Sequence, residues 1–342
     1  MPNLYGPTPN WPDMRVLVTG GSGFIGTNLI EALCQHGVAH IVNIDISAPK
    51  IAQHENYWEK VDILDSAKLA AVAETFAPTH LVHLAAKADT DSEDIDDYRA
   101  NIEGSENLLR SAANIQTIER SVIISSQLVF DTTGTPASNT DFRPATAYGI
   151  SKVETEKLTR AINPNDCWSI LRPTNIWGAW HPRYPGQFWR VLQKGMYFHP
   201  GKEEVIRSYG YIGTLVAQIM SLLVLPKEDV SKRVFYGGDE PMPLLNWVNG
   251  FSVALTGHPV KIVPRFVVRA IALVGDVAFK IGIPCPLTSS RYRSMITDNP
   301  VQMSDSIKVL QTEPLDLDQA ISDTVRWLRA THPDFQLPTD KA

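Results

Sequence analysis

Cysteine is scarce in this sequence, with three residues, Cys34, Cys167 and Cys285, in a chain of 342. They lie far apart and form no CxxC pair, so the sequence offers neither a disulfide framework nor a cysteine metal site. We therefore expect a protein of a reducing compartment, the cytoplasm, that binds no metal.

The sequence also has no excess of positive charge. It contains 31 Lys and Arg residues against 37 Asp and Glu, which gives a net charge of −6 and a pI of about 5.9. This balance gives no electrostatic basis for binding nucleic acid. An anionic ligand would have to be held by local groups, such as backbone N–H groups, a helix N-terminus or individual arginines.

A long uninterrupted apolar run is missing as well, so no membrane span is expected. The nearest approach, Ile262 to Ile283, is interrupted by Arg265, Arg269, Asp276 and Lys280. These four residues fall on one stripe of a helix and leave a broad apolar face. We predict a helix that packs on the core or on a partner subunit; a helix lying on a membrane surface is the alternative.

The sequence does contain the alternating pattern of an α/β protein, with 44% apolar and 20% charged residues. Continuous apolar strands separated by helices are typical of a parallel sheet covered on both faces. Right-handed crossovers then give a doubly wound, Rossmann-type fold. The expected strands are 14–20, 40–45, 58–63, 80–86, 120–126 and 167–173, and the clearest helices are 24–35 and 147–161.

The alternation weakens after about residue 175, where Pro, Gly and Trp punctuate the chain. Strands at 232–238 and 260–264 and helices at 244–255 and 317–329 are still expected. We predict an N-terminal arm at 1–13, which lacks the pattern of a signal peptide. A Rossmann domain at 14–175, with contributions from later strands and helices, and a smaller substrate-binding region at 176–342 complete the chain.

A glycine motif, TGGSGFIG at 19–26, stands where the first strand should turn into the first helix. Gly20 permits the tight turn, Gly23 lets a pyrophosphate approach the backbone, and Gly26 lets helix and strand pack closely. The helix N-terminus, at Phe24 and Ile25, supplies N–H groups to the phosphates. Because strand, motif and helix are in register, the motif predicts dinucleotide binding rather than a plain turn.

Asp45 ends the second expected strand, 19 residues after Gly26. A carboxylate at this place accepts hydrogen bonds from the adenosine ribose and repels a 2′-phosphate, which favours NAD over NADP. Asp62 and Ile63 follow the third expected strand and could hold the adenine. The alternative is that Asp62 only caps the next helix.

Tyr148 and Lys152 are four residues apart on an expected helix and so share one face. A pair at this spacing is common by chance. It becomes specific here because Ser125 and Ser126 end the preceding strand and a dinucleotide motif opens the chain.

With these motifs the sequence resembles the extended short-chain dehydrogenases/reductases, and more narrowly the NAD-dependent nucleotide-sugar epimerase/dehydratase family. The resemblance covers nearly the whole chain, through TGGSGFIG, HLAA (83–86), NIEG around Asn101, SSQLVF (125–130), YGISK (148–152), LRPTNIWG (171–178) and IRSYGYIG (206–213). It implies that Leu84, Ala85 and Ala86 contact NAD, together with the glycine motif, Tyr148 and Lys152. It also implies a homodimer formed through helices at 95–113 and 147–161.

The family chemistry suits these residues. A phenol with an ordinary pKa of about 10 is a poor base at neutral pH. The Lys152 cation would favour the phenolate of Tyr148, which then removes a hydroxyl proton while hydride passes to NAD. The resemblance implies that Ser126 hydrogen-bonds the reacting oxygen and that Asn101 orients the backbone and Lys152.

The substrate-binding residues are implied by resemblance alone. Asn175 and Arg207 match positions that contact the nucleotide diphosphate, and a guanidinium suits that charge and geometry. A surface ion pair is the alternative for Arg207. Lys87 and Asp89 follow the fourth expected strand and could face the sugar. The alternative is that their loop, ADTDSEDID, is mainly a solvated acidic stretch. Three aromatic residues nearby, Trp177, Trp180 and His181, are interpreted as packing and loop residues.

The expected reaction is epimerisation of a nucleotide-diphosphate sugar through a transient 4-keto intermediate. Family dehydratases have an Asp-Glu pair directly after the catalytic Ser/Thr, whereas this sequence has Gln127 and Leu128. Ser208 and Gly213 replace aspartates of many epimerases, which leaves the sugar open. The alternatives are a net oxidoreductase, either a keto-sugar reductase or a 3β-hydroxysteroid dehydrogenase-like enzyme, and a non-catalytic NAD-binding regulator.

Overall fold

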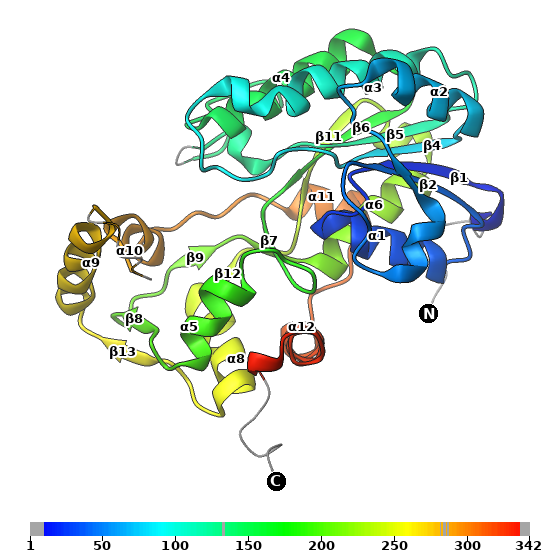
Figure 1. Cartoon of the computed structure of the whole chain (residues 1–342). Helices are drawn as coiled ribbons and strands as arrows, with labels where there is room; N and C mark the ends of the chain where they lie inside the picture. The colour runs from blue at the N-terminus through cyan, green and yellow to red at the C-terminus, as the bar shows by residue number, and fades with distance from the viewer. Residues whose placement is uncertain (1–9, 132–133, 281, 283–284, 286, 336–342) are drawn as a thin grey trace. The chain divides into compact units, whose positions relative to one another are not determined.

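The structure, a computed structural model, describes residues 10–131, 134–280, 282, 285 and 287–335 (Figure 1). The chain forms two compact units. Unit 1 consists of residues 1–176, 212–238 and 302–313, and unit 2 of residues 177–211, 239–301 and 314–342. Unit 1 therefore includes two segments from the second half of the chain, and these two segments divide unit 2 into three parts.

Unit 1 is built on a seven-stranded sheet with the order β11-β6-β5-β4-β1-β2-β3. Every neighbouring pair is parallel. The strands are β1 (Arg15–Thr19), β2 (His40–Asp45), β3 (Trp58–Lys60), β4 (His80–His83), β5 (Arg120–Ile124), β6 (Trp168–Pro173) and β11 (Arg233–Gly237). The order reverses at β1, which lies between β2 and β4, and this is the switch point at which doubly wound sheets bind ligands. The predicted fold class is confirmed.

Several strands are shorter than the sequence pattern predicted. The third ends at Lys60 rather than Ile63, the fourth at His83 rather than Ala86, and the fifth at Ile124 rather than Ser126. In each case the apolar or small residues past the strand leave the sheet ladder and form the loops at its carboxyl edge. These residues are apolar or small because the loops pack against the rest of the protein, not because they pair with a neighbouring strand.

Helices cover both faces of this sheet (Figure 1). On one face α2 packs against α3 and α3 against α4, and on the other α1 packs against α6. The helices of unit 1 are α1 (Phe24–Gln35), α2 (Ser66–Phe76), α3 (Ser105–Ala113), α4 (Ala147–Ile162), α6 (Ile212–Val224), α7 (Lys227–Val230) and α11 (Ser304–Val309). The single helix expected over 95–113 is instead a 3₁₀ turn at Ile95–Tyr98, a π-helical turn at Ala100–Gly104 and then α3.

Local sequence explains where the key helix of unit 1 begins and ends. The Oγ1 of Thr146 accepts a hydrogen bond from the Gly149 N–H at 3.0 Å and caps the N-terminus of α4. Asn163 ends the helix in the left-handed conformation, at φ +50°. These caps set the register that puts Tyr148 and Lys152 in the first two turns.

Unit 2 is organised around an aromatic core. Trp177, Trp189 and Phe251 are fully buried, and the Tyr209 and Trp247 rings stack with centroids 4.3 Å apart. Its elements are α5 (Arg190–Gln193), β8 (Phe198–Pro200), β9 (Ile206–Arg207), β10 (Tyr209–Tyr211), β12 (Met242–Pro243), α8 (Leu244–Thr256), β13 (Lys261–Val263), α9 (Arg265–Lys280), α10 (Ser289–Ile296) and α12 (Leu317–Thr331). β8 pairs with β13 in parallel and β9 with β12 antiparallel.

The helix expected over Ile262–Ile283 is α9, which begins only at Arg265 because residues 261–263 form β13. Ile283 lies outside the described residues. Among the described residues, no helix combines the length and apolarity that spanning a membrane requires. Of the expected N-terminal arm, residues 1–9 also lie outside the described part, and Trp11–Asp13 form a 3₁₀ turn whose tryptophan is buried.

Candidate functional site

The glycine motif forms the turn between β1 and α1. Gly20 has φ +74°, and a Cβ there would lie 2.6 Å from the backbone nitrogen of Ala85. A Cβ on Gly26 would collide with the carbonyl oxygen of Gly20. The backbone therefore passes through this turn at distances that only glycine permits, as the sequence predicted for Gly20 and Gly26.

The start of α1 presents its N-terminus without a side-chain cap. Its N-cap residue is Gly23, which has no side chain that could cap the first turn, and that turn contains Phe24 and Ile25. A Cβ on Gly23 would lie 3.2 Å from the Gly20 carbonyl oxygen. A helix N-terminus of this kind suits a pyrophosphate, because its N–H groups and partial positive charge favour an anion.

The loop after β4 lies against this turn. The N–H of Leu84 donates to the Thr19 carbonyl at 3.0 Å, and the N–H of Ala85 donates to Thr19 Oγ1 at 3.3 Å. The loop of Leu84, Ala85 and Ala86 is thus fixed beside the glycine motif, at the carboxyl edge of the sheet.

Asp45 ends β2 with its carboxylate fixed by the backbone. Its Oδ2 accepts from the N–H of Ser22 at 3.0 Å, and its Oδ1 accepts from the N–H of Ser47 at 2.9 Å. Burial lowers the pKa of Lys50, and the nearby Asp45 carboxylate opposes this shift. Lys50 was not among the residues predicted from the sequence. The carboxylate therefore lies beside the glycine motif, where a ribose of a dinucleotide would be.

Changing Asp45 should change the choice of cofactor. In Asp45→Ala we expect the ratio of the NAD and NADP dissociation constants to shift toward NADP by about tenfold or more, because a hydrogen bond to a charged group contributes about 1.5–3 kcal/mol. Fluorescence titration with both dinucleotides measures the ratio. Glu55→Ala, which removes a carboxylate at an exposed site outside the predicted NAD site, is the control, and an unchanged ratio in Asp45→Ala would contradict the role of Asp45.

Asp62 and Ile63 occupy the turn that follows β3. The Oδ1 of Asp62 accepts from the N–H of Leu64 at 2.9 Å, whereas the N-cap of α2 is Asp65, so the alternative that Asp62 caps that helix is wrong. Ile63 is buried in the core under α2 and α3, and its carbonyl accepts from Asn107 at 3.1 Å. A role for these two residues in holding adenine stays a prediction.

Asn101 lies in the π-helical turn Ala100–Gly104 and is fully buried. Its Oδ1 accepts from the Lys87 N–H at 2.7 Å, and its Nδ2 donates to the Lys87 carbonyl at 3.0 Å and to Ser151 Oγ at 2.9 Å. Its side chain therefore joins the loop after β4 to α4. These hydrogen bonds fix the Lys87 backbone and reach Ser151, the neighbour of Lys152. The role of Asn101 in orienting Lys152 stays a prediction.

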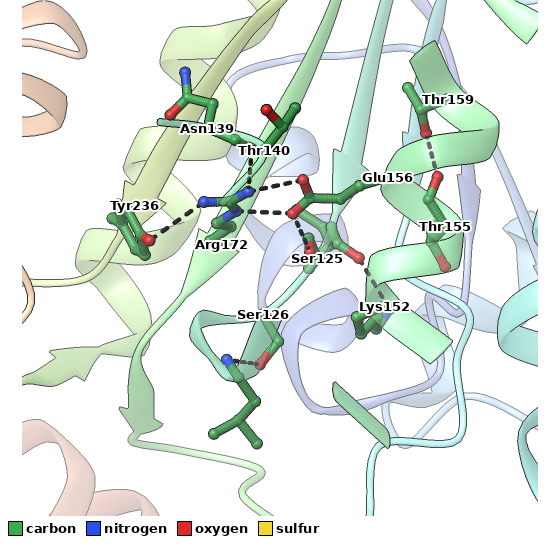
Figure 2. A network of polar contacts seen from close by, with 12 residues as sticks. Ser125, Ser126, Asn139, Thr140, Lys152, Thr155, Glu156, Thr159, Arg172 and Tyr236 are labelled. Carbon is green, nitrogen blue, oxygen red and sulfur yellow. Dashed lines mark hydrogen bonds and ion pairs between the residues drawn. The ribbon is translucent and has the colours of Figure 1, made fainter. Parts of the chain in front are cut away.

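Ser126 and Lys152 both contact the backbone at the carboxyl end of β5 (Figure 2). Ser126 Oγ accepts from the N–H of Leu128 at 3.1 Å, which leaves its O–H to donate to another oxygen. Lys152 Nζ donates to the Ile124 carbonyl at 2.9 Å. Burial lowers the pKa of Lys152 to about 8, and the carboxylate of Glu156 opposes this shift. Glu156 therefore favours the charged form of Lys152 inside the protein.

Tyr148 lies one turn before Lys152 on α4 and is almost fully buried. Its ring packs against that of Tyr98, with centroids 6.1 Å apart. The hydroxyl of Tyr98 donates to the backbone carbonyls of Asp89 and Ser92. Two tyrosines are therefore neighbours here, and only Tyr148 shares a helix face with Lys152.

A buried ion pair next to Ser125 was not predicted from the sequence. Figure 2 shows Arg172 of β6 between Tyr236 and Glu156 of α4. Arg172 donates to both carboxylate oxygens of Glu156, at 2.8 and 2.9 Å, and both side chains are fully buried. Ser125 Oγ also donates to Glu156, at 2.6 Å. An arginine inside the apolar strand CWSILRP, and a glutamate one helical turn after Lys152, were the available sequence clues.

His83, the last residue of β4, is a second residue that the sequence analysis did not single out. Its Nδ1 lies 2.7 Å from Thr19 Oγ1 and its Nε2 lies 2.8 Å from Ser105 Oγ. Ser105 in turn donates to the Asn101 carbonyl. Burial, and to a smaller extent the charge of Lys152, lowers the pKa of His83 to about 3. A neutral imidazole therefore links the glycine turn to the turn that holds Asn101.

This histidine should make the protein sensitive to acid. Below its ordinary pKa of 6.5, the unfolded chain binds a proton on His83 that the folded chain does not, so the free energy of unfolding should fall as pH drops toward about 3. His80, whose pKa burial lowers to about 4, adds to the effect. In urea unfolding, His83→Gln should remove about 1.4 kcal/mol per pH unit from this slope. His36→Gln, at an exposed site, is the control, and an equal slope in both variants would refute the prediction.

The predicted substrate residues lie on different units. Asn175 begins β7 (Asn175–Trp177) and belongs to unit 1, whereas Arg207 lies on β9 of unit 2. Arg207 Nη1 donates to the Thr297 carbonyl at 3.1 Å, and among the described residues the guanidinium forms no ion pair. The observed partner of Arg207 is thus a backbone carbonyl. Contact of Asn175 and Arg207 with a diphosphate stays a prediction.

The other candidates have local structural partners. Lys87 Nζ lies 3.8 Å from the Asp97 carboxylate, and Asp89 Oδ1 accepts from the N–H of Asp91. Trp177 is buried in the aromatic core of unit 2 and His181 stacks on Tyr184 with ring centroids 4.0 Å apart. Trp180 packs against Trp327. These contacts agree with the interpretation of the three aromatic residues as packing residues.

The chain is similar to proteins of one enzyme family. Residues 16–236 match the sequence profile of the NAD dependent epimerase/dehydratase family. A 4-hydroxy-2-methyl-3-oxo-4-farnesyl-3,4-dihydroquinoline-1-oxide ketoreductase of Stigmatella aurantiaca is 30% identical over 181 residues, 48% of this chain and 51% of that protein. A UDP-glucose 4-epimerase of Vibrio cholerae is 29% identical over 243 residues, 66% of this chain and 70% of that protein.

A similar solved structure is the UDP-glucuronic acid 4-epimerase from Bacillus cereus in complex with UDP-glucuronic acid and NAD. It is 20% identical, with a TM-score of 0.68 over 93% of this chain and all of that one. This likeness shows the fold. In sequence, the matched region spans about half the length of the first curated relatives. The expected cofactor, NAD, is that of the family.

Proposed function

Because the chain belongs to the NAD dependent epimerase/dehydratase family, we propose that it epimerises a nucleotide-diphosphate sugar through a transient 4-keto intermediate. The observation that carries the proposal is the arrangement of Ser126 and Lys152 at the carboxyl end of β5, with Tyr148 one turn away on α4. These are the groups that a reversible alcohol oxidation needs, namely a base, a cation that favours its charged form, and a donor to the reacting oxygen.

The residues beside β1 fit a dinucleotide. The cradle of Gly20, Gly23 and Gly26 would hold the pyrophosphate at the N-terminus of α1, and Asp45 would accept from the adenosine ribose. NAD supplies, when bound, the acceptor that takes a hydride from the sugar and returns it.

The chain's own residues handle the proton. Tyr148, as phenolate, removes the proton from the sugar hydroxyl, and the Lys152 ammonium stabilises that phenolate. The Ser126 O–H donates to the same oxygen as it becomes a carbonyl, because Ser126 Oγ already accepts from Leu128. When the hydride returns to the opposite face of the ring, the proton on Tyr148 returns to the oxygen, and no net oxidation results.

The residues after Ser126 argue against eliminating water. Gln127 and Leu128 form the 3₁₀ turn that directly follows the serine, and neither side chain titrates. The Gln127 amide is buried, with an Oε1 that has no hydrogen-bond partner among the described residues. A dehydratase needs a general acid and a general base there, so epimerisation is the better fit.

Asn175 and Arg207 are the residues proposed to contact the nucleotide diphosphate. The guanidinium of Arg207 suits the charge and geometry of that group.

One observation favours a second candidate, a net oxidoreductase acting on an apolar ketone or alcohol. Unit 2 contains a cavity of about 260 Å³ whose walls are mostly aromatic and aliphatic. Phe188, Tyr197, Trp247 and Met295 contribute to it, and among the described residues Arg291 is the one charged residue in its lining. A cavity of this kind suits an apolar ligand, and a ketoreductase is among the relatives.

The test is to incubate the NAD-loaded protein with UDP-, GDP- and dTDP-hexoses without added reductant, following the sugar by NMR and NADH by absorbance. A new epimer at catalytic NAD, without accumulating NADH, is the expected result. Stoichiometric NADH would instead establish a dehydrogenase. If the folded, NAD-loaded protein leaves every sugar unchanged, the proposal fails, and apolar secondary alcohols with NAD test the second candidate.

A further inference from the structure

Helix α9 exposes an apolar face to solvent. Phe266, Leu273, Val274 and Val277 are 74%, 54%, 70% and 63% exposed. Together with Ala270 they recur every three or four residues, so they lie on one side of the helix. We call these five residues the α9 apolar face. Single exposed apolar residues are ordinary, whereas a continuous stripe over three turns of helix indicates an interaction surface.

The opposite side of α9 is the one that packs on unit 2. Val268 and Ala272 are fully buried. A Cβ on Gly275 would collide with the carbonyl of Leu287, so the segment leading into α10 runs directly against this side. α9 is therefore anchored by one stripe, with α10 beside it (Figure 1), and its other stripe is available for a different contact.

The charge around this face differs in sign from the chain as a whole. Residues 261–296 contain six basic residues and one acidic residue, in a chain of net charge −6. Lys261, Arg269 and Arg293 are exposed. The acidic residue, Asp276, accepts a hydrogen bond from the N–H of Ser289 and so serves the start of α10. Of the six basic residues, Arg265 forms an ion pair with Glu203 at 3.4 Å. The α9 apolar face is thus bordered by an excess of positive charge.

We propose that α9 binds the surface of an anionic phospholipid bilayer, with its apolar face in the headgroup–acyl boundary and its basic residues at the phosphates. An amphipathic helix with a basic border has the features of an interfacial helix, since burial of apolar area and attraction to anionic lipid add. A second copy of the chain is a poorer occupant, because two faces with this excess of positive charge would repel each other. The inference is independent of the proposed reaction.

The test uses the full chain and sedimentation with lipid vesicles. Vesicles of phosphatidylcholine with phosphatidylglycerol should carry the protein down, pure phosphatidylcholine should do so much less, and added salt should weaken binding. The double substitution Leu273→Glu and Val274→Glu should lower the partition coefficient by about tenfold or more, because it puts charge where apolar side chains enter the lipid. Arg269→Glu should lower it less.

The control is Val253→Glu, which puts one glutamate at a 48% exposed valine on α8 of the same unit, and its match on α9 is the single substitution Val274→Glu at a 70% exposed valine. The control should bind vesicles like the unaltered chain. Absence of binding to the anionic vesicles, or equal loss of binding in the control and the α9 variant, would overturn the proposal. The proposal would also be overturned if the protein did not bind vesicles but formed a concentration-dependent dimer that the α9 variant abolished. That result would identify a second copy of the chain as the occupant of the α9 apolar face.

Discussion

Replacing Tyr148 by phenylalanine is expected to lower turnover about 10²–10⁴-fold while leaving the dissociation constant for NAD within a small factor. The substitution removes only the hydroxyl that would take the substrate's proton, and general acid–base catalysis contributes about that much to a rate. The ring, which packs against Tyr98 and Leu128, stays in place. Turnover of the nucleotide sugar identified by the panel, and titration with NAD, measure the two quantities.

Tyr98→Phe is the matched control, because it deletes the same group from the neighbouring ring. Among the described residues, the Tyr98 hydroxyl donates to backbone carbonyls of the 89–92 loop and to no side chain, so its loss should change turnover far less. If Tyr148→Phe kept turnover within about tenfold of the unaltered protein, another residue would have to be the base. A NAD-binding regulator would instead retain both its cofactor and its response in the Tyr148 variant.

The second large effect concerns stability. Glu156→Gln should lower the free energy of unfolding by about 3–5 kcal/mol, because it leaves the buried Arg172 guanidinium without its counter-charge. Ser125, Arg160 and Arg172 together give the Glu156 carboxylate four hydrogen bonds, and the guanidinium also contacts the hydroxyl of Tyr236 and the Asn139 carbonyl. Urea unfolding monitored by circular dichroism measures the change.

Glu154→Gln on the same helix is the control. Glu154 pairs with Lys157 at 2.8 Å, but the side chains are 38% and 56% exposed, so loss of this pair should cost about 0.5 kcal/mol or less. Similar costs for the two variants would mean that the buried pair adds no more than a surface pair. Loss of the Glu156 charge should also lower the pKa of Lys152 further, because that carboxylate is the group that raises it.

The parts of this protein that could be predicted from the sequence are those in which function imposes a local pattern. The glycine motif, Asp45 and the Tyr148–Lys152 spacing each sit within one strand, turn or helix, so chain order alone brings their members together. The parallel sheet was predictable for a similar reason, since strands buried on both faces must be apolar throughout. The element boundaries were less predictable, because apolar loop residues at the carboxyl edge resemble strand.

The tertiary structure decided what depends on residues distant in sequence. Glu156 and Arg172 form one bidentate pair only because α4 packs over β6, and His83 joins Thr19 to Ser105 only because β4 lies beside β1. A charged or polar residue in an apolar run is visible in a sequence. Its partner is not, because that partner comes from a distant segment that only the packing of the folded chain brings close. The same holds for α9, whose sequence predicted an apolar face but could not say that Val268 and Ala272, rather than Phe266 and Val274, are the residues buried.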